Sequence, residues 1–253
     1  MKDIIKIVKV KSTIDGSIEE VFFIPSKNKS SPFLVNLHTW SFHKEAELDN
    51  IIKIYKLTGW NILCPEFRGP NTKNNLRAKE ACASRLAKQD IIDAINVVKD
   101  KFDLDFKEIF LLGGSGGGHM ALMMAAYKPQ LWTAVCAWCP ITDLNRWRFE
   151  NPNYKEHIEK CCSKSKKEYK IRSPISYVDK IAKSTVFIFH GKNDKSVPFT
   201  QSLKFYNKII SKYPNANVYL NIFNGEHEIN INESISIFKS FIKKNKIEFK
   251  LKK

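Results

Sequence analysis

Ser115 stands in a glycine-rich stretch where its hydroxyl could act as a nucleophile. Residues 111–120 read LLGGSGGGHM, with Ser115 at the centre of a Gly-x-Ser-x-Gly pattern. An apolar run precedes this stretch and an apolar segment with helical spacing follows it, which predicts a strand, a sharp turn and a helix. Such a turn strains its apex residue and requires small neighbours. The pattern is typical of a nucleophile elbow, although glycine-rich turns between a strand and a helix also bind phosphates.

A serine is a poor nucleophile at neutral pH and needs a base, which in turn needs an acid to hold its tautomer. Asp194 and His227 follow the next predicted strands along the chain, in the order Ser115, Asp194, His227. Parallel strands bring their carboxyl ends to one edge of a sheet, where open α/β sheets place their sites. We therefore predict that Ser115 is the nucleophile, His227 the base and Asp194 the acid.

Other polar residues near strand ends are alternatives to these roles. Asp143 also follows a buried strand and could replace Asp194, because the role of the acid depends on position more than identity. His119 lies four residues past the serine on the same helix, so its ring is expected to point away or pack near the elbow. His190 ends a strand and is expected to support the acid loop.

Two backbone amides could stabilise the negative charge that develops on a substrate oxygen. The amide of Gly116 would lie at the start of a helix, where N–H groups point toward an anion. The turn after the apolar run 33–38 is where a hydrolase places a second donor. The amide of Trp40 is the candidate there, and His38 is expected to brace the loop by hydrogen bonds.

Strands and helices alternate along the chain around these residues. The pattern predicts strands at 4–11, 18–24, 33–38, 61–65, 107–112, 134–138, 185–190 and 218–223, and helices at 45–57, 84–102, 119–127, 200–212 and 233–243. The first two strands should form a hairpin, and the remainder favours a mostly parallel sheet in one domain, 1–253. The lysine-rich tail, 239–253, is expected to be a solvated end.

Two segments are less regular. Residues 144–183 lie between two strands and are too long for a simple crossover, so we interpret them as a partly helical cap or lid whose aromatic residues line a pocket or seat the segment on the body. The loop that contains Glu66 and Arg68 could line a pocket or be solvated.

Charge and composition limit the other function classes. The chain has 253 residues and a formal net charge of +16, with lysine greatly in excess of arginine. Readers of bases and phosphates favour arginine for its bidentate fork. Nucleic-acid binding is therefore not expected, and a non-catalytic polyanion-binding protein is a remote alternative.

The cysteines bear on metal binding, and the apolar runs bear on the compartment. Cys136 and Cys139 have a Cys-x-x-Cys spacing but no accompanying metal-ligand pair, so we interpret them as structural thiols, and no metal or cofactor is expected. Cys161 and Cys162 lie in a lysine-rich segment and could be exposed. No apolar run reaches membrane-spanning length, and the first residues alternate like a strand, which favours a cytoplasmic protein.

Together these motifs resemble one known family. The patterns His-Gly-x-x-Asp-x-x-Val-Pro at 190–198, Gly-x-His at 225–227 and Gly-x-Ser-x-Gly-Gly at 113–118 are similar to those of the catalytic domain of the prolyl oligopeptidase (S9-type) family. The resemblance implies an α/β-hydrolase fold of about eight strands with helices on both faces. It also implies Ser115, Asp194 and His227 as triad, with Gly116 and Trp40 as oxyanion donors. The His-Thr-Trp turn at 38–40 departs from the His-Gly-Gly of many relatives.

These observations predict a serine hydrolase that forms an acyl-enzyme on a small-molecule ester, a carboxylic ester hydrolase. The alternative is a serine peptidase of the prolyl oligopeptidase type, acylaminoacyl or dipeptidyl peptidase-like, acting on short peptides. The oligomeric state and the substrate are not encoded in these motifs.

Overall fold

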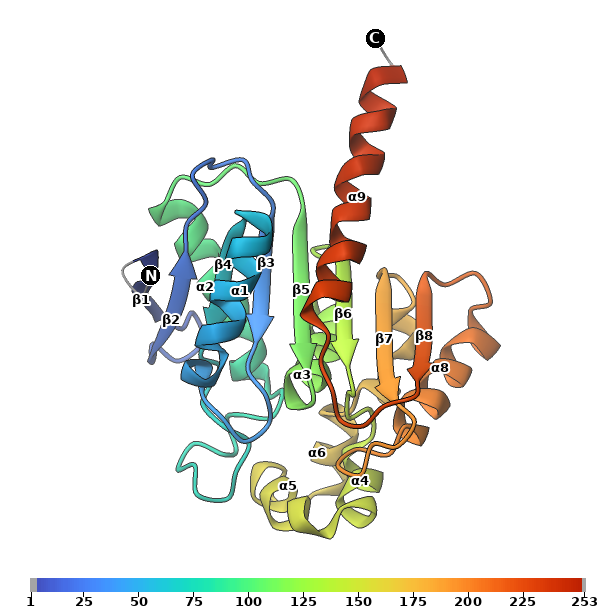
Figure 1. Cartoon of the computed structure of the whole chain (residues 1–253). Helices are drawn as coiled ribbons and strands as arrows, with labels where there is room; N and C mark the ends of the chain where they lie inside the picture. Colours follow the sequence, from blue (N-terminus) through green and yellow to red (C-terminus); the bar gives the residue numbers. More distant parts are fainter. Residues whose placement is uncertain (1–3, 252–253) are drawn as a thin grey trace.

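The centre of the protein is an eight-stranded sheet (Figure 1), seen in a computed structural model that describes residues 4–251 and the side chains of 4–242. The strands are β1 (Lys6–Lys11), β2 (Ile18–Ile24), β3 (Phe33–Leu37), β4 (Asn61–Pro65), β5 (Ile109–Gly114), β6 (Ala134–Trp138), β7 (Val186–Gly191) and β8 (Val218–Phe223). Each corresponds to a strand that the sequence predicts, with ends that agree within two residues.

The strands are arranged in the order β1-β2-β4-β3-β5-β6-β7-β8. The β1–β2 and β2–β4 pairs are antiparallel, and all later neighbours are parallel, so the sheet is mostly parallel as expected. The register pairs Leu37 with Gly113 and Gly114 with Trp138. The turns that follow β3, β5 and β6 therefore leave the sheet side by side at one edge.

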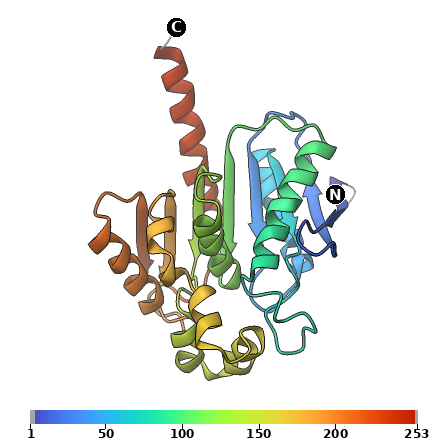
Figure 2. The same ribbon diagram turned by 180° about the vertical axis from the view of Figure 1, so that it is seen from behind.

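Helices cover both faces of the sheet (Figures 1 and 2). Helices α1 and α9 pack on one face, and α2, α3 and α8 pack on the other. Their bounds are α1 (Leu48–Thr58), α2 (Arg85–Lys101), α3 (Gly116–Tyr127), α8 (Thr200–Lys212) and α9 (Ile231–Leu251), and a short 3-10 helix, η2 (Lys44–Glu47), precedes α1.

Each face has its own hydrophobic core. Strands β3 to β6 are buried along their whole length, as their continuous apolar runs predict for strands covered on both faces. The side of α2 that carries Ile91, Ala94 and Val98 packs on one face, and Ile235 and Phe238 of α9 pack on the other. Full burial of a valine, isoleucine or phenylalanine side chain contributes about 1.5–3 kcal/mol.

The C-terminal helix differs from the prediction. Helix α9 begins at Ile231 and continues to Leu251, rather than ending near residue 243. The reason is local, because residues 231–251 contain no glycine or proline to stop a helix and are rich in good helix formers. Lys252 and Lys253 lie outside the described residues. Among residues 4–251, no helix combines the length and the apolar character needed to span a bilayer.

Residues 144–183, which we call the cap segment, are partly helical. They form α4 (Leu144–Glu150), η3 (Pro152–Tyr154), α5 (Lys155–Cys161), α6 (Lys166–Ile171), η4 (Pro174–Ser176) and α7 (Val178–Ile181). The expectation that Cys161 and Cys162 could be exposed is wrong. Both thiols are buried in a cluster that also contains Ile158, Trp147 and Trp40, because this side of α5 packs onto the body.

Candidate active site

Ser115 lies at the turn between β5 and α3, in a backbone conformation that few residues adopt. Its φ is 56° and its ψ is −120°, which places a non-glycine residue in a strained region. Between residues 109 and 126 it is the one position that is not buried. Its amide donates to the carbonyl of Trp138 at 2.8 Å, which fixes the turn against β6. The hydroxyl is thus presented at the sheet edge by a rigid frame.

The glycines around Ser115 allow two other segments to touch the turn. A methyl group added to Gly116 would lie 2.5 Å from the Trp40 nitrogen, so the two backbones are in direct contact. A methyl group added to Gly114 would lie 2.0 Å from Cδ1 of Ile229. The serine is therefore flanked by the turn after β3 on one side and by the loop after β8 on the other.

Asp194 and His227 form a close pair. His227 Nδ1 lies 2.6 Å from Asp194 Oδ2, and the Oδ1 atom accepts hydrogen bonds from the amides of Ser196 and Val197, both at 2.8 Å. Because the carboxylate accepts, Nδ1 carries the proton and Nε2 is left as the basic nitrogen. The Asp194 side chain is fully buried, whereas that of His227 is 29% exposed.

The Asp194 carboxylate is held in its charged form. Burial would raise the pKa of Asp194, but the hydrogen bonds from His190, His227 and the Val197 amide outweigh it and hold the pKa well below the usual range. The Asp194 carboxylate is therefore ionised at neutral pH, and its charge favours the protonated form of the imidazole beside it.

His190 supports the loop after β7 that carries Asp194, as the sequence predicts. Its Nε2 lies 2.8 Å from the Val197 carbonyl and 3.2 Å from Asp194 Oδ2, and its Nδ1 lies 2.7 Å from the Ser202 hydroxyl. Both partners of Nε2 are acceptors, so Nε2 carries the proton and Nδ1 accepts from Ser202. This ring ties the loop after β7 to α8.

The structure does not bring the alternative residues to the same place. Asp143 caps α4, where its carboxylate accepts from the Arg146 amide at 3.1 Å. His119 is buried with Nε2 2.7 Å from the Arg172 carbonyl, and burial lowers the pKa of His119 to about 4. His119 is therefore neutral at pH 7, bonds the cap segment and packs with its ring centroid 5.8 Å from that of Trp40.

Trp40 is fixed by contacts of its carbonyl and of its ring. Its carbonyl accepts from the Asn71 amide at 2.7 Å, and its ring packs edge-on against Trp147 with centroids 4.9 Å apart. His38 braces the turn as predicted, with Nδ1 3.0 Å from the Thr39 carbonyl and its ring stacked on Phe67. The Trp40 amide is thereby held next to Gly116.

One predicted contact is not formed. Within the described part of the chain, the Ser115 hydroxyl makes no hydrogen bond, so its pairing with His227 stays a prediction. The structure thus joins Asp194 to His227, and Gly116 to Trp40, at the edge of the sheet where Ser115 lies.

The sequence left open whether Arg68 lines a pocket or lies in a solvated loop. The structure shows that Arg68 is deeply buried. It has a φ of +76°, and its guanidinium lies 2.9 Å from Asp90, 2.7 Å from Asp15 and 3.0 Å from Glu80. The loop 66–83 is therefore anchored to α2 and to the hairpin, and Glu66 is buried as well. The partners are distant in sequence, so no local signal reveals them.

Cys139 is the other residue whose place the sequence did not reveal. It follows β6 with a φ of +45° and is buried. Its sulfur, an Asp194 oxygen and a His227 nitrogen all lie within 4.8 Å of one another, and its thiol is 3.5 Å from the Glu228 carbonyl. Burial raises the pKa of the thiol to about 12, so it is uncharged at neutral pH. Cys139 thus packs against the Asp194–His227 pair.

The parallel sheet, the strained serine turn and the acid–histidine pair at one edge define an α/β hydrolase. Residues 59–244 match the prolyl oligopeptidase family, which covers most of the chain. The chain therefore belongs to the prolyl oligopeptidase family, and this membership indicates an enzyme of the serine hydrolase class.

Individual relatives are more distant. Acylamino-acid-releasing enzyme 1 of Oryza sativa is 24% identical over 206 residues, which are 74% of this chain and 26% of that protein. The chain thus spans about a quarter of that relative's length. The acylaminoacyl peptidase of Pyrococcus horikoshii matches 94% of this chain and 40% of its own, with a TM-score of 0.69 and 21% identity. An esterase of Pyrococcus furiosus matches 96% of this chain and 94% of its own, with a TM-score of 0.70 and 21% identity.

Proposed function

We propose that this protein hydrolyses carboxylic esters through an acyl-enzyme on Ser115. His227 Nε2 takes the hydroxyl proton as Ser115 Oγ attacks the ester carbonyl carbon, and Asp194 stabilises the imidazolium that forms. The oxyanion of the tetrahedral intermediate accepts from the amides of Gly116 and Trp40. The intermediate expels the alcohol, which receives the proton from His227. A water molecule activated by His227 then releases the acid.

The observation that carries this proposal is the Asp194–His227 pair at 2.6 Å, which follows β7 and β8 at the same edge of the sheet as the strained, partly exposed serine after β5. Hydrogen bonding at Nδ1 leaves Nε2 as a base, which is the state that general-base catalysis needs. Hydrogen bonds between a serine and its base are often long in a ligand-free site and tighten with substrate. The missing Ser115–His227 bond is compatible with this behaviour.

The preference for an ester rests on what surrounds the serine. Trp40 and Ile229, which touch the glycines on its two sides, are apolar. An ester expels its alcohol more readily than a peptide expels its amine, so a triad and two amide donors suffice for ester hydrolysis. An ester also needs no subsite for a charged substrate terminus. The chain also has the fold of the Pyrococcus furiosus esterase and matches 94% of that esterase's length.

A peptidase is the second candidate, favoured by the names of the curated relatives. The rice and mouse proteins that match this chain are acylamino-acid-releasing enzymes. A blocked amino-terminal residue of a peptide would then take the place of the ester, with the same residues in the same roles.

A fluorophosphonate probe tests the common step of both candidates. We expect covalent labelling of the wild-type protein at Ser115 and none of Ser115→Ala, since the probe requires an activated serine. Absence of labelling in a folded wild-type protein, or equal labelling of Ser115→Ala, would reject the proposal.

Parallel turnover assays separate the two substrates. Short p-nitrophenyl esters and N-acylaminoacyl naphthylamides would be compared by kcat/KM on the same preparation. We expect ester hydrolysis to dominate, and Ser115→Ala to abolish both activities. Amide turnover without ester turnover would establish the peptidase instead.

A further inference from the structure

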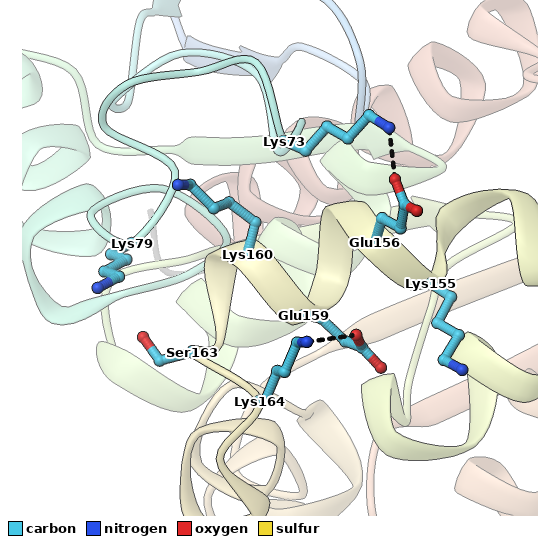
Figure 3. Close-up of a pocket in the computed structure, with 8 residues that line it drawn as sticks. All are labelled: Lys73, Lys79, Lys155, Glu156, Glu159, Lys160, Ser163 and Lys164. Atoms are coloured by element: carbon cyan, nitrogen blue, oxygen red, sulfur yellow. Dashed lines mark hydrogen bonds and ion pairs between the residues drawn. The ribbon is translucent and has the colours of Figure 1, made fainter.

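A cavity lies between the loop 66–83 and helix α5 of the cap segment (Figure 3). Its volume is about 650 Å³, which lies in the range of cavities that hold small molecules. We call it the lysine cavity, and its lining consists of Lys73, Lys79, Lys155, Glu156, Glu159, Lys160, Ser163 and Lys164. None of these residues belongs to the candidate active site.

The lysine cavity carries a positive charge that its own acids do not balance. Five lysines face two carboxylates, and both carboxylates already have partners. Glu156 pairs with Lys73, and Glu159 lies 3.4 Å from Arg148 and 3.9 Å from Lys164. Among the described residues, Lys79, Lys155 and Lys160 form no ion pair. Like charges gathered in one concave surface repel one another and focus the field on an anion.

The frame that carries these lysines is ordered by contacts of its own. The Lys73 amide donates to His157 Nδ1 at 2.9 Å, which joins the loop 66–83 to α5 at one end. Ser163 and Lys164 both have left-handed φ values, +50° and +54°, and the Lys164 amide bonds the Glu159 carbonyl at 3.0 Å. The turn after α5 is therefore fixed, so the positions of the side-chain stems are set by the backbone.

The lining divides into a paired end and a free end. Figure 3 shows Lys79, Lys160 and Ser163 on the same side of the cavity, away from the Lys73–Glu156 pair. This side offers two ammonium groups without carboxylate partners in the described chain and one hydroxyl donor. All of these groups are hydrogen-bond donors.

The donors of the lining are suited to a phosphate anion. Ammonium groups act as point charges that bind phosphate oxygens from several directions. The volume exceeds what one phosphate would fill. We propose that the lysine cavity binds a small polyphosphate anion, such as a linear tripolyphosphate or the phosphate chain of a nucleotide.

Binding of such an anion would join the two walls of the cavity. Lys79 lies on the loop 66–83 and Lys160 on α5, so an anion held by both ties the loop to the cap segment. The opposite side of α5 packs through Ile158 and Cys161 on the cluster that contains Trp40. The bound anion would therefore stabilise the folded protein by mass action, whether or not Ser115 is catalytic.

Isothermal titration calorimetry with sodium tripolyphosphate tests the proposal on the full chain. We expect saturable binding of one anion per protein that weakens with added salt, since the groups are exposed. Lys79→Gln/Lys160→Gln removes two charges and keeps most of the side-chain length, and should weaken binding about tenfold or more. Both side chains are exposed, so the double variant should fold, which circular dichroism would verify.

A matched control separates the cavity from the overall charge. Lys6→Gln/Lys9→Gln removes the same charge from exposed positions on β1 and should change the affinity by less than about twofold. Ser115→Ala should bind as the wild type does. Equal losses in the two double variants would show that diffuse charge attracts the anion and would overturn the proposal, as would the absence of saturable binding.

Two further titrations define the source of the phosphate. A nucleoside triphosphate that binds more tightly than tripolyphosphate would indicate a nucleotide ligand, and equal affinity would indicate a site for the phosphate chain alone. Citrate serves as a polycarboxylate of similar charge. Citrate binding as tight as that of tripolyphosphate would overturn the assignment of phosphate chemistry.

Discussion

The sheet edge around Ser115 and the lysine cavity are built by opposite means. At the edge, backbone atoms and buried side chains fix the groups, as the Asp194 carboxylate shows with its two amide donors. In the lysine cavity, the charged groups stand at the ends of exposed side chains on a fixed backbone. Bond-making chemistry requires atoms held in place, whereas attraction of an anion requires only a field.

One segment takes part in both regions. The loop 66–83 supplies the Asn71 amide that holds the Trp40 carbonyl, and it also supplies Lys73 and Lys79 to the lysine cavity. Buried Arg68 anchors this loop. The comparison therefore predicts large effects for changes at fixed, buried groups and small effects for changes at exposed charges.

The largest effect is expected for Asp194→Asn. The amide of asparagine can donate to His227 Nδ1, which favours the tautomer whose Nε2 is protonated and cannot act as a base. We expect kcat for ester hydrolysis to fall about 10⁴-fold. Asp143→Asn is the matched control, since asparagine also caps helices and Asp143 caps α4. Loss of activity in Asp143→Asn with retention in Asp194→Asn would show that Asp143, and not Asp194, is the acid.

A smaller effect is expected for Gly116→Ala. The added methyl would lie 2.5 Å from the Trp40 nitrogen, so the two amides must separate. We expect kcat to fall about 10²- to 10³-fold, as for loss of an oxyanion donor. Gly59→Ala has φ +65° but open space around the methyl, so it should cost about 1 kcal/mol of stability and no activity. A folded Gly116→Ala protein with full activity contradicts the oxyanion assignment.

Arg68→Met should lower the stability of the fold rather than act on the chemical step. Removal of the guanidinium leaves Asp90 buried without its partner, and we expect the free energy of unfolding in urea to fall by about 3 kcal/mol. Arg85→Met changes an exposed arginine and should alter it by less than about 0.5 kcal/mol. Similar losses in both variants would argue against a special role for the buried network.

The same variant has a defined dependence on pH. The hydrogen bond from Arg68 holds the pKa of Asp15 below its ordinary value of 3.8. A lowered pKa stabilises the folded state above the ordinary value, and this contribution is lost as the pH falls toward the folded-state pKa. The difference in stability between wild type and Arg68→Met should therefore shrink below about pH 4. A difference that grows on acidification would contradict this interaction.

The smallest effect is expected at the rim of the lysine cavity. Glu156 pairs with Lys73, but both side chains are more than half exposed. Exposed pairs of this kind contribute little, because water and salt screen them. We expect Glu156→Gln to leave the urea midpoint unchanged within error and to strengthen tripolyphosphate binding slightly, since one negative charge leaves the cavity. A clear loss of stability would show that this rim is more rigid than its exposure indicates.

The sequence predicts the strands and most helices because their signals are local. The apolar runs at β3 to β7 and the glycines around Ser115 act over a few residues. Sequence patterns could not reveal the partners of Arg68, which lie 22 and 53 positions away at Asp90 and Asp15. The same reason applies to the cap segment, whose buried cysteines lie in a cluster that also contains Trp40, Ala78 and Cys82 from distant parts of the chain.

The place of β5 within the sheet has a consequence for how long the serine turn survives thermal fluctuation. Four strands lie on one side of β5 and three on the other, so it is far from both exposed margins. Transient opening of a sheet starts at its rims and reaches interior strands only in the rarest, most complete unfolding events. Amide protons of residues 109–114 should consequently be among the slowest in the molecule to exchange with deuterium, while those of β1 and β8 exchange early.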